Sequence, residues 1–346
     1  MSTRPIGYYV HHHGAGHLAR ARVIRDALSC PVVLLGTSVG DDEGLTLDDD
    51  RTVDQSAACE DGPTRPDALH YAPLDHHGIR HRVAAMTRWI AEAQPSLMIV
   101  DVSVEVAMLA RLASVPVLYV RLAGERTDPA HLEAFRGARA LIAPYPHQFE
   151  AAGTPGWVRE KTLYCPGLTA KRQRGNSDGG AVLVVAGRGG DAFDGERLAD
   201  AARTCSHVQW RVIGPVTPPR DCPSNLTLVG WSDRADQEIR QASIVVGAAG
   251  DGLVGAVLAA EKPFICIPEP RPFDEQIATA AGLDRANAAI VRSAWPSSSE
   301  WPELIDAAMR IDPERQRALS DPQGPQKLAR WIEELVGLTH PNMDAE

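Results

Sequence analysis

Apolar segments that predict strands alternate with segments that predict helices over most of the chain. Segments rich in apolar residues predict strands over residues 6–10, 32–35, 97–100, 116–120, 140–143, 181–186, 208–213, 226–229, 244–246, 264–267 and 289–291. Apolar residues at helical spacing, or runs of small residues, predict helices over residues 17–29, 82–93, 104–112, 193–205, 236–241, 253–260, 301–309, 313–320 and 325–336. Because buried strands that alternate with helices are typical of parallel sheets, the predicted fold class is α/β.

A polar, glycine-rich stretch divides this pattern into two halves. It covers residues 164–180 and contains K-R-Q-R-G-N-S-D-G-G, which is typical of a linker. We therefore predict one domain over residues 1–163 and a second over residues 181–324. A length of 346 residues is also what two domains with full cores require.

Composition excludes some classes of function. The formal charge is −10 and there is no run of Lys or Arg, which argues against binding to nucleic acid. No apolar stretch reaches the roughly 18–20 residues of a membrane span, and the first residues lack a signal peptide's apolar region, so we expect a cytoplasmic protein. The six cysteines form no C-x-x-C pair, which predicts neither disulfides nor a cysteine zinc site.

One candidate catalytic pair lies at the carboxyl ends of two predicted strands of the first domain. Gly14 and Gly16 form a turn between the first strand and its helix, and His17 stands at the helix start. Asp101 ends another strand at the same sheet edge, where it can accept the Nδ1–H of a histidine and stabilise the imidazolium of a general base. The alternative is that Asp101 caps the helix that begins at Val104, a role for which Ser103 competes.

Three consecutive histidines, His11 to His13, lie between the first strand and this turn. Adjacent side chains on an extended segment point in alternating directions, so the three cannot all bind one ion. We predict no metal site here.

The most informative stretch of the second domain runs from Val245 to Gln276. A strand leads into the glycine-rich turn of Ala249, Gly250, Asp251 and Gly252, and a helix, a further strand and the loop that holds Glu275 and Gln276 follow. In a parallel sheet, such a turn leaves free N–H groups at a helix N-terminus, which attract phosphate.

This order of turn, helix, strand begun by proline and acid–Gln pair resembles the donor-binding half of GT-B glycosyltransferases. The similarity extends to the peptidoglycan GlcNAc transferases and to the antibiotic and plant nucleotide-sugar transferases. It implies two Rossmann-like domains facing a cleft, with the last helix, 325–337, packed back on the first domain. It also implies sugar transfer from a UDP-sugar or dTDP-sugar to an acceptor hydroxyl or amine, with inversion, His17 as base and Asp101 as its partner. Neither a cofactor nor an active-site metal is expected.

The resemblance assigns further residues to the donor. Glu275 and Gln276 would bind the sugar hydroxyls, and Trp231 would stack on the base, with Ser232 and Asp233 capping the next helix. A second glycine turn, which would approach the diphosphate, consists of Gly187, Arg188, Gly189 and Gly190.

The chain departs from the family at the ribose. The residue seven positions before Pro263 is Ala256, where the family usually has a glutamate that accepts both ribose hydroxyls. Two explanations stay open: a deoxynucleotide donor, or a ribose held by Asp251 or Glu261. UDP and dTDP are therefore both candidates.

The acceptor is the least defined part. The variable residues 54–82, together with Gly14, Gly16, Arg121, Arg126 and His131, are candidates for the acceptor side. The acceptor could be a small molecule or lipid-linked, the latter compatible with peripheral membrane contact. Alternative functions are a nucleotide-sugar 2-epimerase of the same fold and a non-catalytic nucleotide-sugar-binding subunit.

Overall fold

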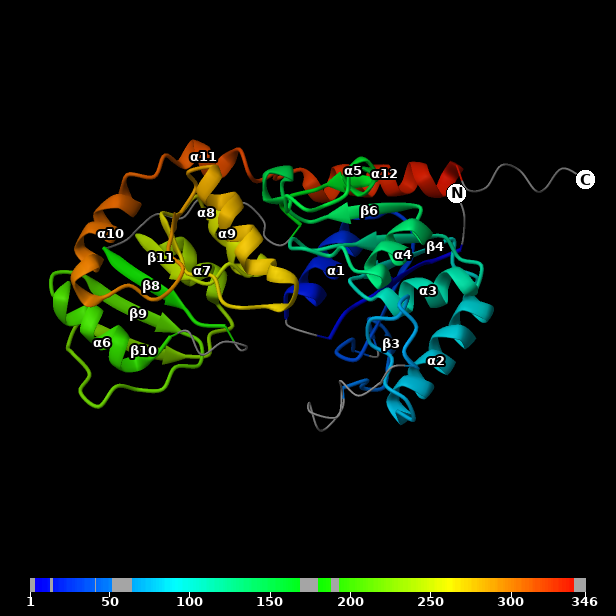
Figure 1. The fold of residues 1–346 in the computed structure, drawn as a ribbon, viewed down its shortest axis with the longest axis horizontal. Helices are drawn as coiled ribbons and strands as arrows, with labels where there is room; N and C mark the ends of the chain where they lie inside the picture. The colour runs from blue at the N-terminus through cyan, green and yellow to red at the C-terminus, as the bar shows by residue number, and fades with distance from the viewer. Residues whose placement is uncertain are drawn as a thin grey trace, which may run out of the picture.

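The computed structural model describes residues 4–12, 15–40, 42–51, 64–168, 180–187 and 193–338. The chain forms two lobes that lie side by side, each built around a parallel sheet (Figure 1). The predicted α/β class with two parallel-sheet domains is confirmed.

The first sheet has seven parallel strands in the order β3-β2-β1-β4-β5-β6-β7. Its central strands are buried along their whole length, which explains why the sequence shows continuous apolar runs there. The strands are β1 (Ile6–Tyr9), β2 (Val32–Gly36), β3 (Gly44–Thr46), β4 (Leu97–Asp101), β5 (Val117–Val120), β6 (Ala140–Ala143) and β7 (Thr162–Tyr164). The helices of this part are α1 (Ala15–Ala27), α2 (His77–Ala93), α3 (Val104–Leu112), α4 (Pro129–Gly137) and α5 (Gly156–Glu160).

The second sheet has six parallel strands in the order β10-β9-β8-β11-β12-β13. Apolar cores cover both of its faces, and Trp210 packs edge-on against Trp301 in one of them. The strands are β8 (Ala181–Val185), β9 (Gln209–Ile213), β10 (Leu226–Gly230), β11 (Ile244–Gly247), β12 (Phe264–Cys266) and β13 (Ile290–Val291). The helices are α6 (Gly195–Thr204), α7 (Ala235–Gln241), α8 (Asp251–Ala260), α9 (Glu275–Arg285), α10 (Trp301–Met309) and α11 (Pro313–Arg317).

Several elements differ from the sequence-based expectation. Strands β3 and β7 extend the first sheet at its two edges, so 140–143 is not its last strand. Helix α4 was also missed, although Asp128 caps it through its side chain and Pro129 is its first residue, both typical start signals. The expected cap of α7 at Ser232 and Asp233 is wrong, because the capping position falls on Arg234.

Each sheet has a point where the strand order reverses, and such points are where ligands bind in open α/β sheets. In the first sheet the reversal lies between β1 and β4, which precede His17 and end in Asp101, respectively. In the second sheet it lies between β8 and β11, which precede Gly187 and Gly250. Both predicted half-sites therefore stand at reversal points.

The last helix, α12 (Gly324–Leu338), returns to the first lobe and packs against α1 (Figure 1). Its side chains Leu328 and Ile332 are fully buried there. The chain thus passes between the lobes twice, and the two connections touch. A Cβ added at Gly167 would lie 2.2 Å from the carbonyl oxygen of Asp321, and one at Gly324 would lie 2.4 Å from that of Pro166. Only glycine allows this close approach.

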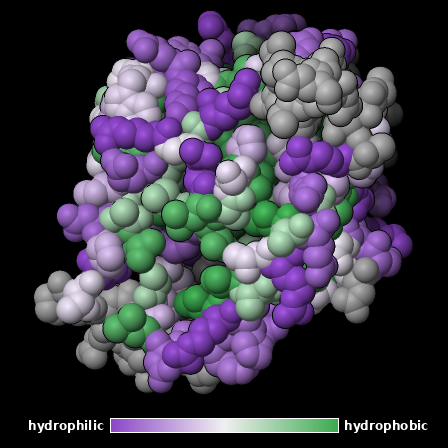
Figure 2. All heavy atoms as spheres, turned by 90° about the vertical axis from the view of Figure 1, so that its right-hand side faces the viewer, coloured by the Kyte–Doolittle hydropathy of each residue, from purple (hydrophilic) through white to green (hydrophobic). Residues whose placement is uncertain are grey.

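The lobes also share a core. Tyr145 and Phe149, which follow β6, belong to the same apolar cluster as residues of α8 and α9. Figure 2 views the end of the molecule formed by the first lobe, where apolar side chains gather toward the middle of the face and polar ones surround them. Among the described helices, none combines the length and the apolar character that crossing a bilayer requires.

Candidate functional site

The structure brings His17 and Asp101 together. His17 lies in the first turn of α1, directly after β1, and Asp101 is the last residue of β4, the neighbour of β1. The two side chains meet with 3.2 Å between His17 Nδ1 and Asp101 Oδ2. Asp101 is completely buried, whereas 12% of the His17 side chain is exposed. A buried carboxylate therefore holds an imidazole that reaches solvent.

The alternative role of Asp101 as a helix cap is not what the structure has. Ser103 caps α3, because its side chain accepts a hydrogen bond from the N–H of Val106. Asp101 is thus free to face α1.

A third side chain, Arg20, joins this pair. It lies one turn after His17 on α1 and is 1% exposed. Its Nη2 is 3.0 Å and 3.1 Å from the two oxygens of Asp101 and 3.0 Å from His17 Nδ1. His17 Nδ1 thus lies within reach of both the Asp101 carboxylate and the Arg20 guanidinium, and a proton on Nδ1 would donate to the carboxylate. In that tautomer, His17 Nε2 carries the free lone pair.

The charges of this group stabilise one another. Burial alone would raise the pKa of Asp101, but Arg20 and His17 outweigh it and hold that pKa below its ordinary value. Burial likewise opposes the charge of Arg20, yet Asp101 and Asp251 raise its pKa above the ordinary value. At neutral pH, Asp101 is a carboxylate and Arg20 a cation.

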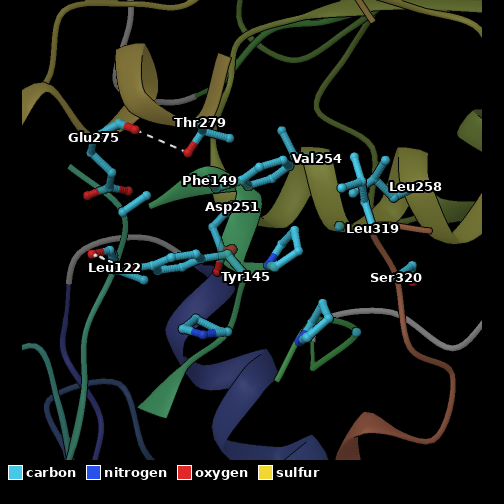
Figure 3. Close-up of a pocket in the computed structure, with 16 residues that line it drawn as sticks. Leu122, Tyr145, Phe149, Asp251, Val254, Leu258, Glu275, Thr279, Leu319 and Ser320 are labelled. Carbon is cyan, nitrogen blue, oxygen red and sulfur yellow. Dashed lines mark hydrogen bonds between the residues drawn. The ribbon is translucent and has the colours of Figure 1, made fainter. Parts of the chain in front are cut away.

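Arg20 also connects the pair to the second lobe. Its Nη1 forms an ion pair with Asp251, the first residue of α8. Gly250 is the N-cap of this helix and provides no side chain, so the first N–H groups of α8 have no side-chain cap from that position. Asp251 and Glu275 line a pocket between the lobes, with Leu122 and Tyr145 on the side of the first lobe (Figure 3). The candidate base and the candidate phosphate site are therefore two ends of one group of contacts.

Gln276 fixes the turn before α8. Its Oε1 accepts hydrogen bonds from the backbone N–H of Ala249, at 3.2 Å, and of Glu269, at 2.8 Å. A Cβ added at Gly250 would lie 3.8 Å from Gln276 Nε2. The amide oxygen is therefore committed to the backbone, and the amide nitrogen is the part of Gln276 that faces the start of α8.

Glu275 is held from the opposite lobe. Arg126 Nη2 lies 3.0 Å from Glu275 Oε2, and the Arg126 guanidinium also lies over the ring of Phe273. The backbone supports the contact, because the N–H of Glu125 donates to the carbonyl of Phe273 at 2.7 Å. Arg126, predicted for the acceptor side, thus contacts the loop that is predicted to bind the donor.

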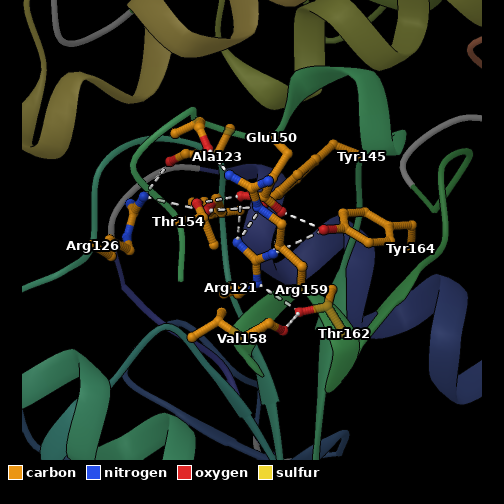
Figure 4. Close-up of polar contacts among 12 residues, drawn as sticks. Arg121, Ala123, Arg126, Tyr145, Glu150, Thr154, Val158, Arg159, Thr162 and Tyr164 are labelled. Atoms are coloured by element: carbon orange, nitrogen blue, oxygen red, sulfur yellow. Dashed lines mark hydrogen bonds and ion pairs between the residues drawn. The ribbon is translucent and has the colours of Figure 1, made fainter. Parts of the chain in front are cut away.

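Arg121 lies in a different, buried group. It forms a buried ion pair with Glu150 and donates to the hydroxyl of Tyr145 at 2.7 Å (Figure 4). Tyr164 and Thr162 complete the group. The Arg121 side chain is only 3% exposed, and its place on the acceptor side stays a prediction.

The remaining predicted residues are dispersed. His131 is buried in α4, where its ring packs against Phe273, and Trp231 lies at the end of β10 with 52% of its surface exposed. Trp231 therefore does not fill the core, and its stacking on a base stays a prediction. Apart from the adjoining backbone and chain neighbours, none of the described residues has an atom within 4 Å of a Cβ built at Gly16 or Gly187. The predicted residues Gly14, Arg188, Gly189 and Gly190 lie outside the described residues.

Two expectations need correction. Glu261 is poorly placed to replace the ribose glutamate missing at Ala256, because it is the C-cap of α8 and pairs with Arg317 at 2.7 Å. The rings of His11 and His12 do not point in opposite directions but stack, with centroids 4.7 Å apart, since the strand ends at Tyr9. His11 in turn lies 5.3 Å from the ring of His17.

Arg20 is the site residue that the sequence reasoning missed. A signal was available, because Arg20 follows His17 by three residues and so shares its helix face. It stands between the apolar positions Leu18 and Ala21, where a charged residue invites a search for buried partners.

Residues 217–326 match the model of the glycosyltransferase family 28 C-terminal domain. No curated protein sequence matches the chain.

Solved structures resemble the chain over nearly its whole length. Phytolacca americana UGT2, in complex with UDP-2-fluoro-glucose and pterostilbene, has a TM-score of 0.67 and 14% identity and covers 96% of this chain and 100% of its own. Acinetobacter baumannii MurG has a TM-score of 0.59 and 17% identity, covering 96% and 99%. The spinosyn rhamnosyltransferase SpnG, complexed with thymidine diphosphate, has a TM-score of 0.60 and 16% identity, covering 95% and 100%.

The fold is therefore the two-domain GT-B fold. Within it, the second domain carries the match to glycosyltransferase family 28. The resemblance to GT-B nucleotide-sugar glycosyltransferases, which the sequence motifs indicated, is confirmed.

Proposed function

We propose that this protein is a glycosyltransferase that moves a sugar from a nucleoside-diphosphate sugar to an acceptor hydroxyl or amine. The observation that carries the proposal is the line of contacts His17–Asp101–Arg20–Asp251, which joins a candidate base in one lobe to the N-terminus of α8 in the other. The family match of the second domain supports the activity, and the length of α8 supports phosphate binding at its start.

His17 is the general base in this mechanism. Its Nε2 takes the proton of the acceptor as the acceptor oxygen or nitrogen forms a bond to the anomeric carbon. Asp101 keeps the other proton on Nδ1 and stabilises the imidazolium. The bond between the anomeric carbon and the diphosphate oxygen breaks, and the diphosphate keeps the electron pair. Attack opposite to the leaving group inverts the anomeric centre.

The leaving diphosphate is stabilised by the N-terminus of α8 and by the turn before it. Backbone N–H groups and the helix dipole favour a negative charge at this position. Metal-independent turnover is therefore part of the proposal, and activity that persists in a chelator would support it.

The contacts favour a deoxynucleotide donor over UDP. Ala256 cannot accept a hydrogen bond from a ribose hydroxyl. The two candidate substitutes are engaged elsewhere, Asp251 by Arg20 and Glu261 by Arg317. We therefore propose dTDP-sugars as the donor class. SpnG, with thymidine diphosphate bound, is a neighbour with this nucleotide.

The two alternatives are not favoured. A 2-epimerase or a non-catalytic binding subunit would share the fold, but the matched family model and the solved neighbours described above are those of glycosyltransferases. An epimerase also would not need a base aligned for an incoming acceptor.

The decisive experiment measures donor consumption by the purified protein with and without a panel of acceptors. We expect dTDP-sugar to be consumed only when an acceptor is present. The variant His17→Ala should lose about 10²–10⁴-fold in turnover while retaining donor binding. The matched control is His207→Ala, which removes an exposed histidine from the α6–β9 connection. Acceptor-independent conversion would identify an epimerase, and full activity of His17→Ala would refute the base assignment.

A further inference from the structure

Three potential metal ligands converge on the surface of the first lobe, and none of them belongs to the line of contacts from His17 to Asp251. They are Asp48, in the segment after β3, and His77 and His81, both on α2. One ligand atom of each lies within 4.8 Å of the others. His81 Nδ1 is 3.2 Å from Asp48 Oδ2, and the rings of His77 and His81 have centroids 3.8 Å apart.

The helix explains why the histidines meet. His77 and His81 are four residues apart on α2, so their side chains lie on the same face, one turn after the other. Two imidazoles at this spacing on a helix are a recurrent pair of zinc ligands. All three side chains are exposed, so an ion reaches them from solvent without any rearrangement of the core.

The position of Asp48 is fixed by its neighbours in the chain. A Cβ added at Gly78, in the first turn of α2, would lie 1.8 Å from the carbonyl oxygen of Asp49, so the segment lies directly on the helix. The next residue, Asp50, forms an ion pair with the buried Arg82 of α2. Its carbonyl oxygen accepts a hydrogen bond from the hydroxyl of Tyr71 at 2.7 Å. Asp48 is therefore held beside the histidines before any ion binds.

We propose that Asp48, His77 and His81 form a binding site for a borderline divalent cation of the zinc type, which ties the segment after β3 to α2. Two imidazole nitrogens and one carboxylate oxygen suit zinc and exclude calcium and magnesium, which prefer oxygen ligands. Small rotations of the exposed side chains bring the three atoms to the roughly 3.4 Å separations of a tetrahedral ion with ligands at about 2.1 Å. Water completes the coordination.

A second group of the same composition is less suited to a cation. His70, Asp128 and His131 also come together, but Asp128 already caps α4. His131 is buried, and the nearby Arg126 repels positive charge there. This group is therefore the competitor that the test has to separate.

The test is calorimetric titration of the untagged, metal-free protein with zinc chloride. We expect saturable binding in the wild type, and a weakening of at least about tenfold in His81→Ala and in His77→Ala, because even the loss of an outer-shell partner costs about 10–100-fold. The control His207→Ala should bind like the wild type. Zinc should also raise the melting temperature of the wild type but not of His81→Ala, since an ion that binds only the folded state stabilises it.

Each other outcome contradicts the proposal. Binding that survives in His81→Ala but is lost in His131→Ala would assign zinc to the competing group. Weak, non-saturable uptake that is equal in all variants would mean an adventitious ion only. Because His77 and His81 are exposed, both variants should fold, and their circular dichroism spectra verify this.

Discussion

The guanidinium of Arg20, from helix α1 of the first lobe, pairs with the carboxylate of Asp251, the first residue of helix α8 in the second. The same guanidinium donates to both oxygens of Asp101. One cation therefore lies between the partner of the candidate base and the candidate phosphate site. Arg20 therefore couples the relative position of the lobes to the charge of the His17–Asp101 pair.

The first prediction concerns Asp251→Asn. A carboxylate at the start of α8 repels a diphosphate, so we expect this variant to bind nucleoside diphosphates tighter by about two- to fivefold, the effect of one charge at a helix end. Because Asp251 is engaged by Arg20, the gain should be equal for UDP and dTDP. Calorimetric titration with both nucleotides measures it. A loss of affinity for UDP alone would instead make Asp251 a ligand of the ribose.

The second prediction concerns Arg20→Met. The substitution leaves Asp101 buried without its cation, and breaking a buried ion pair typically costs about 3–5 kcal/mol of the free energy of unfolding. Urea unfolding at neutral pH measures this loss. Arg22→Met, two residues along the same helix, is the control. Its pair with Glu43 is partly exposed, so it should cost at most about 1 kcal/mol. Equal losses in both variants would contradict a special role for Arg20.

The third prediction concerns the contact between the lobes at Gly124. This residue has a φ of 104°, and a Cβ there would lie 2.3 Å from the carbonyl oxygen of Phe273. Gly124→Ala should therefore break the hydrogen bond from Glu125 to Phe273 and weaken the Arg126–Glu275 pair. We expect lower affinity for the donor sugar and a larger radius of gyration in X-ray scattering. Gly156→Ala, with open space around its Cβ, should leave both unchanged.

The fourth prediction concerns pH. Burial opposes the charge of Glu150, but Arg121, Tyr164 and Thr154 lower its pKa below the ordinary value. A carboxyl with a lowered pKa adds stability above its unfolded pKa of about 4, and this contribution is lost as the pH falls further. Glu150→Gln should therefore cost about 3–5 kcal/mol at neutral pH, and its difference from the wild type should shrink on acidification. Urea unfolding over this pH range checks both points, and a pH-independent difference would contradict the charge-based explanation.

Much of the fold could be predicted from the sequence, because strands that are buried in a parallel sheet consist mostly of consecutive apolar residues. The central strands of both sheets follow that pattern, and most helices follow the helical spacing of apolar residues. Short edge strands do not, since Gly44–Thr46 and Thr162–Tyr164 are each three residues long and only partly apolar. These two segments become strands because each pairs with the neighbouring strand of the sheet.

The part of the site that depends only on the direction of the parallel strands could be predicted from the sequence. His17 follows one parallel strand and Asp101 ends another, so their common edge could be inferred before the strands were known to be adjacent. The ion pairs that join the two lobes could not be inferred in this way. Arg20 with Asp251, and Arg126 with Glu275, depend on how two separate lobes meet, and a local pattern carries no information about that.

The two places where the chain passes between the lobes, around Gly167 and around Gly324, lie in backbone contact with each other. If the lobes rotate relative to each other and this contact is preserved, the hinge has to lie at these two connecting segments. Residues far from the hinge would then move over long distances, whereas residues beside it would hardly move. Grafting a different second lobe onto this first lobe would therefore require joining both connecting segments, with glycine retained at each.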